Sequence, residues 1–128
     1  MEKLFLVILM MVSSLTSTMA FAFPTKESES FRHLVLLKFK HTTTNEQMVS
    51  TTKAFVNLKN SIDEVSAIEW GSNISTEGLN KDFTHSYLIT FKNEKARATY
   101  MEHPAHRALE GNIGRYIADV VIFDYWAN

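Results

Sequence analysis

The segment HLVLLKFK at residues 33–40 is apolar on both of the faces that a β-strand presents. Val35 and Leu37 would lie on one face, and Leu34 and Leu36 on the other. A strand of this kind is stable only where other parts of the protein cover both faces. The chain therefore requires a sheet that has a layer of structure on each side.

The remaining segments predict helices and strands in a definite order. A polar stretch rich in Thr precedes a helical pattern whose apolar face carries Met48, Thr52, Phe55, Val56 and Ile62. The expected elements are a strand over residues 33–40, this helix of about four turns, a strand over 65–74, a loop over 75–82, a strand over 85–91, a helix over 94–101, a helix starting at Pro104 and a strand over 116–125. This β-α-β-β-α-β order predicts an α+β, ferredoxin-like fold with helices on one face of an antiparallel four-stranded sheet.

Helices on a single face leave the other face of the sheet bare, although its residues are apolar. A large exposed apolar face marks an interaction surface. We therefore expect a homodimer in which two sheets face each other and close an α/β barrel.

The N-terminus predicts export. Lys3 precedes an uncharged apolar block at residues 4–12, and small residues follow up to Ala22. This is the pattern of a secretory signal peptide over residues 1–22, with an uncleaved anchor as the alternative. We expect a flexible leader at 23–31, a single domain at 32–128, a secreted or periplasmic location, and no membrane contact after cleavage. The absence of cysteine leaves stability to packing and to a partner subunit.

Charge and ligand spacing exclude some classes of partner. The formal net charge is −1, without the basic excess that nucleic-acid binding requires. His103 and His106 could offer two zinc ligands, but no third ligand follows at an obvious spacing, so no metal is expected.

Five segments in order resemble the stress-responsive A/B barrel (Dabb) family: HLVLLKFK at 33–40, EWG at 69–71, THSYLITF at 84–91, YMEHPAH at 100–106 and VIFDY at 121–125. The resemblance implies a dimeric α+β barrel. Its spacing is especially similar to that of a plant polyketide cyclase of that family, which implies an intramolecular aldol condensation without a cofactor. Carried over, the catalytic residues are Tyr100 and His106, with Asp124 orienting the His, and His33 and His85 support them.

The residues around Pro104 are suited to that chemistry. Proline fits the first position of a helix, which makes His103 the cap and places His106 in the first turn. The positive end of the helix dipole disfavours imidazolium there and preserves a neutral base. An aldol cyclisation needs such a base, and the Tyr100 phenol can donate a hydrogen bond to the developing enolate.

Departures from the cyclase pattern predict a different pocket. Leu109 and Thr52 stand where aromatic residues are expected, Phe55 replaces a Tyr, Ile117 a Trp and Glu110 a Gly. We expect Phe55 and Leu109 to contact a small, partly apolar carbonyl ligand, and a coenzyme A thioester is not expected outside the cell.

Structural readings of the same residues stay open. His33 and His85 could be hydrogen-bonded core histidines, Tyr100 a helix aromatic bonded to the backbone, and His106 with Asp124 a pair that joins helix to strand. Two alternatives of function therefore remain: a non-catalytic stress-protective barrel, and a barrel of the cofactor-free monooxygenase type.

Overall fold

The computed structural model describes residues 30–128, so the expected signal peptide and nearly all of the expected leader lie outside the described residues. The elements are β1 (Phe31–Phe39), α1 (Asn45–Ser61), β2 (Val65–Ser72), β3 (His85–Phe91), α2 (Glu94–Glu102), α3 (Pro104–Ile113), a 3-10 turn (Gly114–Tyr116) and β4 (Ile117–Trp126). The expected boundaries are close to the observed ones. One boundary differs at the start of the domain. The sequence places Phe31 in the leader, but Phe31 begins β1 and is buried against Trp126 and Phe91.

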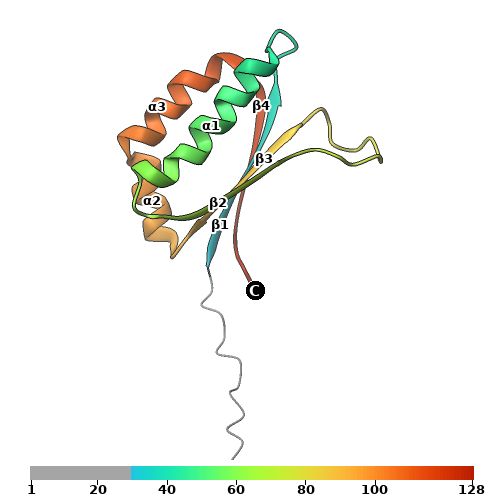
Figure 1. Cartoon of the computed structure of the whole chain (residues 1–128). Helices are drawn as coiled ribbons and strands as arrows, with labels where there is room; N and C mark the ends of the chain where they lie inside the picture. The colour runs from blue at the N-terminus through green and yellow to red at the C-terminus, as the bar shows by residue number, and fades with distance from the viewer. Residues whose placement is uncertain (1–29) are drawn as a thin grey trace, which may run out of the picture.

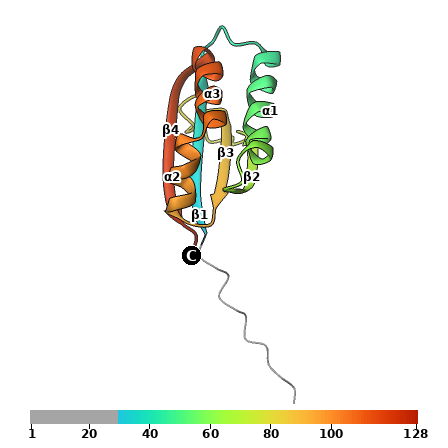
Figure 2. The same ribbon diagram turned by 90° about the vertical axis from the view of Figure 1, so that its left-hand side faces the viewer.

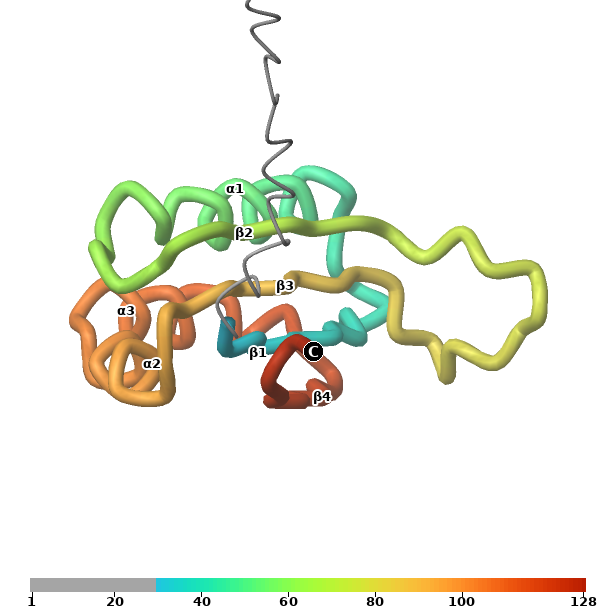
Figure 3. The backbone as a smooth tube through the Cα atoms, turned by 90° about the horizontal axis from the view of Figure 1, so that it is seen from below, coloured from blue at the N-terminus to red at the C-terminus, as the bar shows by residue number. Residues whose placement is uncertain are grey.

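The strands form one antiparallel sheet in the order β2-β3-β1-β4, and all three helices lie on one face of it (Figure 1). The expected ferredoxin-like α+β fold is confirmed. Viewed onto the helical face, α1 lies over β2 and β3, whereas α2 and α3 lie toward β1 and β4 (Figure 2). The connection between β2 and β3 extends away from the body of the domain (Figure 3).

The alternation of β1 separates its two faces. Phe31, His33, Val35 and Leu37 are buried beneath the helices, while the residues between them are only partly buried. On β4, Phe123 lies opposite Leu34 on the sheet face without helices and is 59% exposed. The face that the sequence predicts to be bare is therefore apolar and uncovered in the single chain.

Capping residues decide where each helix begins. Thr44 and Gln47 form a reciprocal capping box at α1, and Asn93 accepts a hydrogen bond from the third residue of α2. At α3, His103 Nδ1 accepts from the Ala105 amide at 3.1 Å and Pro104 takes the first helical position. The predicted cap and proline start are confirmed, and His106 lies in the first turn of α3.

Candidate functional site

A cavity of about 340 Å³ lies between α2 and α3 on one side and β1 and β4 on the other. It forms here because the helices leave β4 uncovered, so Val120 and Ile122 stay exposed on the helical side of the sheet. Its lining is mostly apolar, with a small polar group at one end. The lining includes these predicted site residues: His33, Phe55, Tyr100, His106, Leu109 and Asp124.

Tyr100 is at the centre of the polar group. Its side chain is 1% exposed, and its ring centroid lies 4.4 Å from that of His106 and 6.0 Å from that of His33. Burial, with a smaller contribution from the charge of Glu110, raises the pKa of the Tyr100 phenol above its ordinary value. Tyr100 lines the cavity, and a phenol O–H there can donate a hydrogen bond to a ligand.

His106 is held in one orientation. Its Nδ1 lies 3.3 Å from the Met101 carbonyl oxygen, which can only accept, so the proton is assigned to Nδ1. Nε2 then carries the lone pair. The nearest carboxylate oxygen to Nε2 belongs to Glu110, at 3.9 Å, one helical turn further along α3. The arrangement supplies a base next to a phenol.

Asp124 orients His33 instead of His106, which corrects the pairing expected from the sequence. Its Oδ1 lies 2.6 Å from His33 Nδ1, and its Oδ2 lies 3.1 Å from Arg97. The reason is the strand register, because Asp124 and His33 are directly opposite each other on β4 and β1. His106 is on α3, where its Nδ1 already meets the Met101 carbonyl.

His33 is therefore a second imidazole with a fixed tautomer. It is 4% exposed, and burial lowers its pKa despite the opposing effect of the Asp124 carboxylate. The neutral ring donates Nδ1–H to Asp124 and keeps a lone pair on Nε2. His33 thus adds a second imidazole close to the Tyr100 ring, which His106 also contacts.

Arg97 is a site residue that the sequence reading missed. It lines the cavity, forms an ion pair with Asp124, and places its guanidinium 5.8 Å from the centre of the Phe31 ring. The spacing in the sequence could have indicated it. Arg97 precedes Tyr100 by three residues, and residues three apart share one face of a helix.

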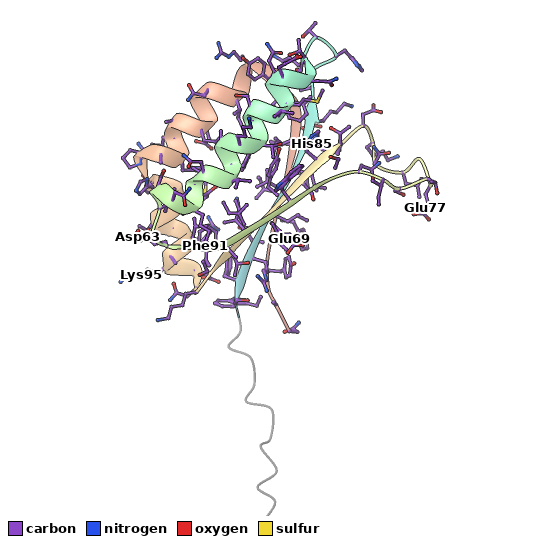
Figure 4. The ribbon with its side chains drawn as sticks, viewed as in Figure 1. Asp63, Glu69, Glu77, His85, Phe91 and Lys95 are labelled. Atoms are coloured by element: carbon purple, nitrogen blue, oxygen red, sulfur yellow. The ribbon has the colours of Figure 1, made fainter. Side chains whose placement is uncertain are left out.

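His85 lies outside this cavity, so the structure does not bring it to the other predicted site residues. It stands at the start of β3, at the end remote from Phe91 (Figure 4). Thr84 Oγ1 is 2.9 Å from its Nδ1, and its ring packs edge-on to Phe39 at 5.0 Å. Burial lowers the pKa of His85.

A second hollow, of about 560 Å³, adjoins His85 between the first half of α1 and strands β2 and β3. It is larger than the first cavity, but neither Tyr100 nor His106 reaches it. Thr52 lines this second hollow, and its hydroxyl is 2.7 Å from the Tyr87 hydroxyl. Tyr87 also stacks on Phe55 at 4.0 Å, so these three side chains form a wall between the two spaces. We place the candidate chemistry in the smaller cavity because the bases and the phenol are there.

Two features of the described part of the chain bear on other classes of site. No group of three His, Cys, Asp or Glu side chains in residues 30–128 is placed to hold a metal ion. None of the helices in this same part is both long enough and apolar enough to cross a membrane.

The fold and the cavity define a small ferredoxin-like α+β domain whose site is built between the sheet and its two C-terminal helices. Residues 31–127 match the Stress responsive A/B Barrel Domain (Dabb) family, and the chain belongs to it. The family resemblance inferred from the sequence is confirmed.

Two relatives and one solved structure illustrate the similarity. Stress-response A/B barrel domain-containing protein HS1 of Arabidopsis thaliana is 32% identical over 94 residues, 73% of this chain and 86% of HS1. Olivetolic acid cyclase of Cannabis sativa is 31% identical over 73% of this chain and 93% of the cyclase. The crystal structure of a dimeric ferredoxin-like protein of unknown function from Thermobifida fusca has a TM-score of 0.68 at 22% identity, covering 79% of this chain and 93% of that one, and shows the fold alone.

Proposed function

We propose that each subunit binds a small carbonyl compound in the cavity between the sheet and helices α2 and α3, and catalyses proton transfer next to the carbonyl without a cofactor. The observation that carries this proposal is the position of the Tyr100 phenol beside the His106 imidazole, with their ring centroids 4.4 Å apart in a mostly apolar cavity. The similarity to olivetolic acid cyclase supports an aldol cyclase-like reaction.

The proposed step uses the His106 lone pair as the base. Nε2 removes a proton from the carbon next to a carbonyl, the electron pair of that C–H bond moves to the carbonyl oxygen, and an enolate forms. The Tyr100 O–H donates a hydrogen bond to this oxygen as its charge develops. The enolate carbon then attacks a second carbonyl of the same ligand, which forms a C–C bond and closes a ring. The resulting alkoxide recovers the proton from the His106 imidazolium.

An exchange assay tests the proton transfer without knowledge of the natural substrate. The probe is para-butylacetophenone, whose methyl protons lie next to the carbonyl, and NMR in D₂O follows their replacement by deuterium. We expect His106→Ala to slow the enzyme-catalysed exchange by roughly 10²–10⁴-fold. Tyr100→Phe should slow it by about 10²-fold or more, as for loss of an oxyanion donor.

His33→Ala tests the rival base, and His41→Ala is the matched control. His41 is exposed and does not line the cavity. If His33→Ala abolishes exchange while His106→Ala does not, the base is His33 with its Asp124 partner. Exchange by wild type at the rate of buffer alone, or equal rates in all three histidine variants, would refute the catalytic proposal.

We also propose that the protein is a homodimer, assembled through the sheet face without helices. The support is the exposed apolar row on β4, including Val121, Phe123 and Tyr125, together with the dimeric relative from Thermobifida fusca. Covering such a row removes apolar area from water, at roughly 25 cal/mol per Å². Sedimentation or light scattering of the purified protein gives the mass directly.

Export is a further part of the proposal, because residues 1–22 have the order of charge, apolar block and small residues expected of a signal peptide. Determining the N-terminal residue of the protein purified from its native source tests it. A mature chain starting at Phe23 is the expected result, and a chain that retains Met1 inside the cell would contradict it.

A second candidate function is a non-catalytic, protective barrel, which the stress-response name of the relative HS1 favours. It predicts that His106→Ala leaves biological protection intact. Loss of stress tolerance in cells that carry this variant, with normal protein levels, would count against it.

A further inference from the structure

The loop between β2 and β3 carries an acceptor sequence for N-linked glycosylation. Asn73 is followed by Ile74 and Ser75, which is the Asn-X-Ser pattern with a residue other than proline at its centre. None of the other asparagines in the sequence has Ser or Thr two positions later. The chain thus has a single position at which this modification can occur, and Asn73 does not line the cavity that holds Tyr100 and His106.

The acceptor sequence lies at the surface. Asn73, Ile74 and Ser75 are all exposed, and Ile74 is 92% exposed. The loop extends away from the body of the domain (Figure 3), and Glu77, two residues after Ser75, is at its tip (Figure 4). A glycosylating enzyme has to reach the asparagine from solvent, and a protruding surface loop gives it that access.

A turn holds the asparagine and the serine of this sequence close together. The Asn73 Oδ1 accepts a hydrogen bond from the Ser75 amide at 3.2 Å, which forms an Asx turn. The Ser75 Oγ accepts in the same way from the Glu77 amide at 3.3 Å. The bond of Asn73 uses its side-chain oxygen and not its Nδ2 amino group, which is the atom that carries an N-linked glycan.

The surroundings of Asn73 leave space for a bulky group. Asn73 borders a hollow of about 250 Å³, whose lining also includes Phe83 and Thr84. Its backbone is secured independently of its side chain, because the Asn73 amide donates to the Thr84 carbonyl at 2.8 Å. The strand order places β2 at the opposite edge of the sheet from the apolar row on β4, three strand spacings or about 14 Å away. The attachment point therefore lies apart from the row proposed for dimer contact.

The N-terminal segment supplies the compartment that this modification requires. N-linked glycans are added to proteins that enter the secretory pathway of eukaryotic cells, and the pattern marks a surface loop of a secreted protein. Residues 1–22 have the charge, apolar block and small residues of a signal peptide. The signal and the acceptor sequence are separate features of the chain, and the second has a use only where the first operates.

From these features we infer that Asn73 is an N-linked glycosylation site. The co-substrate is an oligosaccharide joined to a lipid through pyrophosphate. Nδ2 of Asn73 forms a bond to the C1 carbon of the first sugar as the bond from C1 to the pyrophosphate breaks. The nitrogen loses one proton, and the lipid pyrophosphate leaves with the electron pair. The inference rests on the export part of the proposed function and not on the chemistry of the cavity.

Expression of the full chain with its own N-terminal segment in yeast tests it. Protein from the cells and from the medium is compared by gel mobility and peptide mass spectrometry, with and without peptide-N-glycosidase, which converts a glycosylated Asn to Asp. The variants are Asn73→Gln, Ser75→Ala and Ser75→Thr. The matched control is Asn60→Gln, which makes the same change at an exposed asparagine of α1 outside any acceptor sequence.

We expect wild type, Ser75→Thr and Asn60→Gln to show a mobility shift that the glycosidase removes, and to have Asp at position 73 after the treatment. Asn73→Gln and Ser75→Ala should lack the shift, because the first removes the attachment site and the second removes the hydroxyl that the pattern requires. The same peptide analysis of the protein purified from its native source should find the glycan at Asn73.

The N-terminal residue of the same samples separates two failures. A mature chain that starts at Phe23 with an unmodified Asn73 would refute the glycosylation site and leave export standing. An unmodified chain that retains Met1 would refute both. A glycosidase-sensitive shift that persists in Asn73→Gln would exclude Asn73 as the attachment site. The proton-exchange assay succeeds or fails independently, because Asn73 lies outside the cavity.

Discussion

Replacing Asp124 tests the connection between the strand register and the site. Its carboxylate joins His33, which is buried, to Arg97, which is partly buried. Asp124→Ala leaves the His33 Nδ1–H without its acceptor in a site that water hardly reaches. Asp124→Asn keeps an acceptor oxygen of similar shape but removes the charge. The two variants therefore separate the hydrogen bond from the ion pair.

The magnitude follows from these contacts. A hydrogen bond to a charged group is worth about 1.5–3 kcal/mol, and an unpaired buried donor costs about 1–3 kcal/mol. The Arg97 pair adds at most about 1 kcal/mol, because its guanidinium is a third exposed to water. We expect Asp124→Ala to lower the free energy of unfolding by about 2–3 kcal/mol, which is roughly 10–20 °C in Tm for a domain of this size. Asp124→Asn should lower the free energy of unfolding by about 1–2 kcal/mol.

Urea unfolding followed by circular dichroism measures both variants at one protein concentration, since a dimer's stability depends on concentration. The control is Asp82→Asn, which makes the same chemical change in an exposed ion pair with Lys38 and should alter stability by less than about 0.5 kcal/mol. If Asp124→Ala lowers the free energy of unfolding by no more than this control does, the partly buried Asp124–His33 bond does not hold β4 to β1 in the way described.

Three further outcomes are expected. Since the pKa of His33 is lowered in the folded state, the unfolded chain takes up the proton first as pH falls; stability should therefore decrease below about pH 6.5, and less steeply in His33→Gln. Tyr87→Phe should lower the free energy of unfolding by about 1–3 kcal/mol in thermal or urea unfolding, because it leaves the buried Thr52 hydroxyl without a hydrogen-bond partner. Adding Thr52→Val should recover part of that loss. Phe123→Glu should convert the dimer to a monomer in light scattering, and an unchanged mass would exclude this face as the interface.

Local chemistry made much of the fold predictable. The β1 segment is apolar on both faces whatever surrounds it, and Thr44, Asn93 and Pro104 mark helix starts through hydrogen bonds within a few residues. The boundary error at Phe31 also follows from the limits of local chemistry. An aromatic residue next to a polar leader has no local reason to belong to a strand, and only its packing against Trp126 shows that it does.

The candidate site was predictable only in part, because it joins residues that are far apart in the chain. Tyr100 and His106 are six positions apart, so the turn at Pro104 was enough to suggest that they meet. The partner of Asp124 depends on how β4 aligns with β1, 91 residues away, and the expected partner His106 was wrong. His85 lies outside the cavity because it stands at the far end of β3, beside Phe39.

The sequence by itself determined the order of strands and helices, the family, the turn before His106 and an uncovered apolar face. These depend on side-chain pattern and on contacts between near neighbours in the chain. The tertiary structure decided that Asp124 holds His33, that Arg97 pairs with Asp124 at the cavity, and that the side chains of Phe55, Tyr87 and Thr52 separate two hollows. Strand register and helix placement set those distances, and both result from packing over the whole domain.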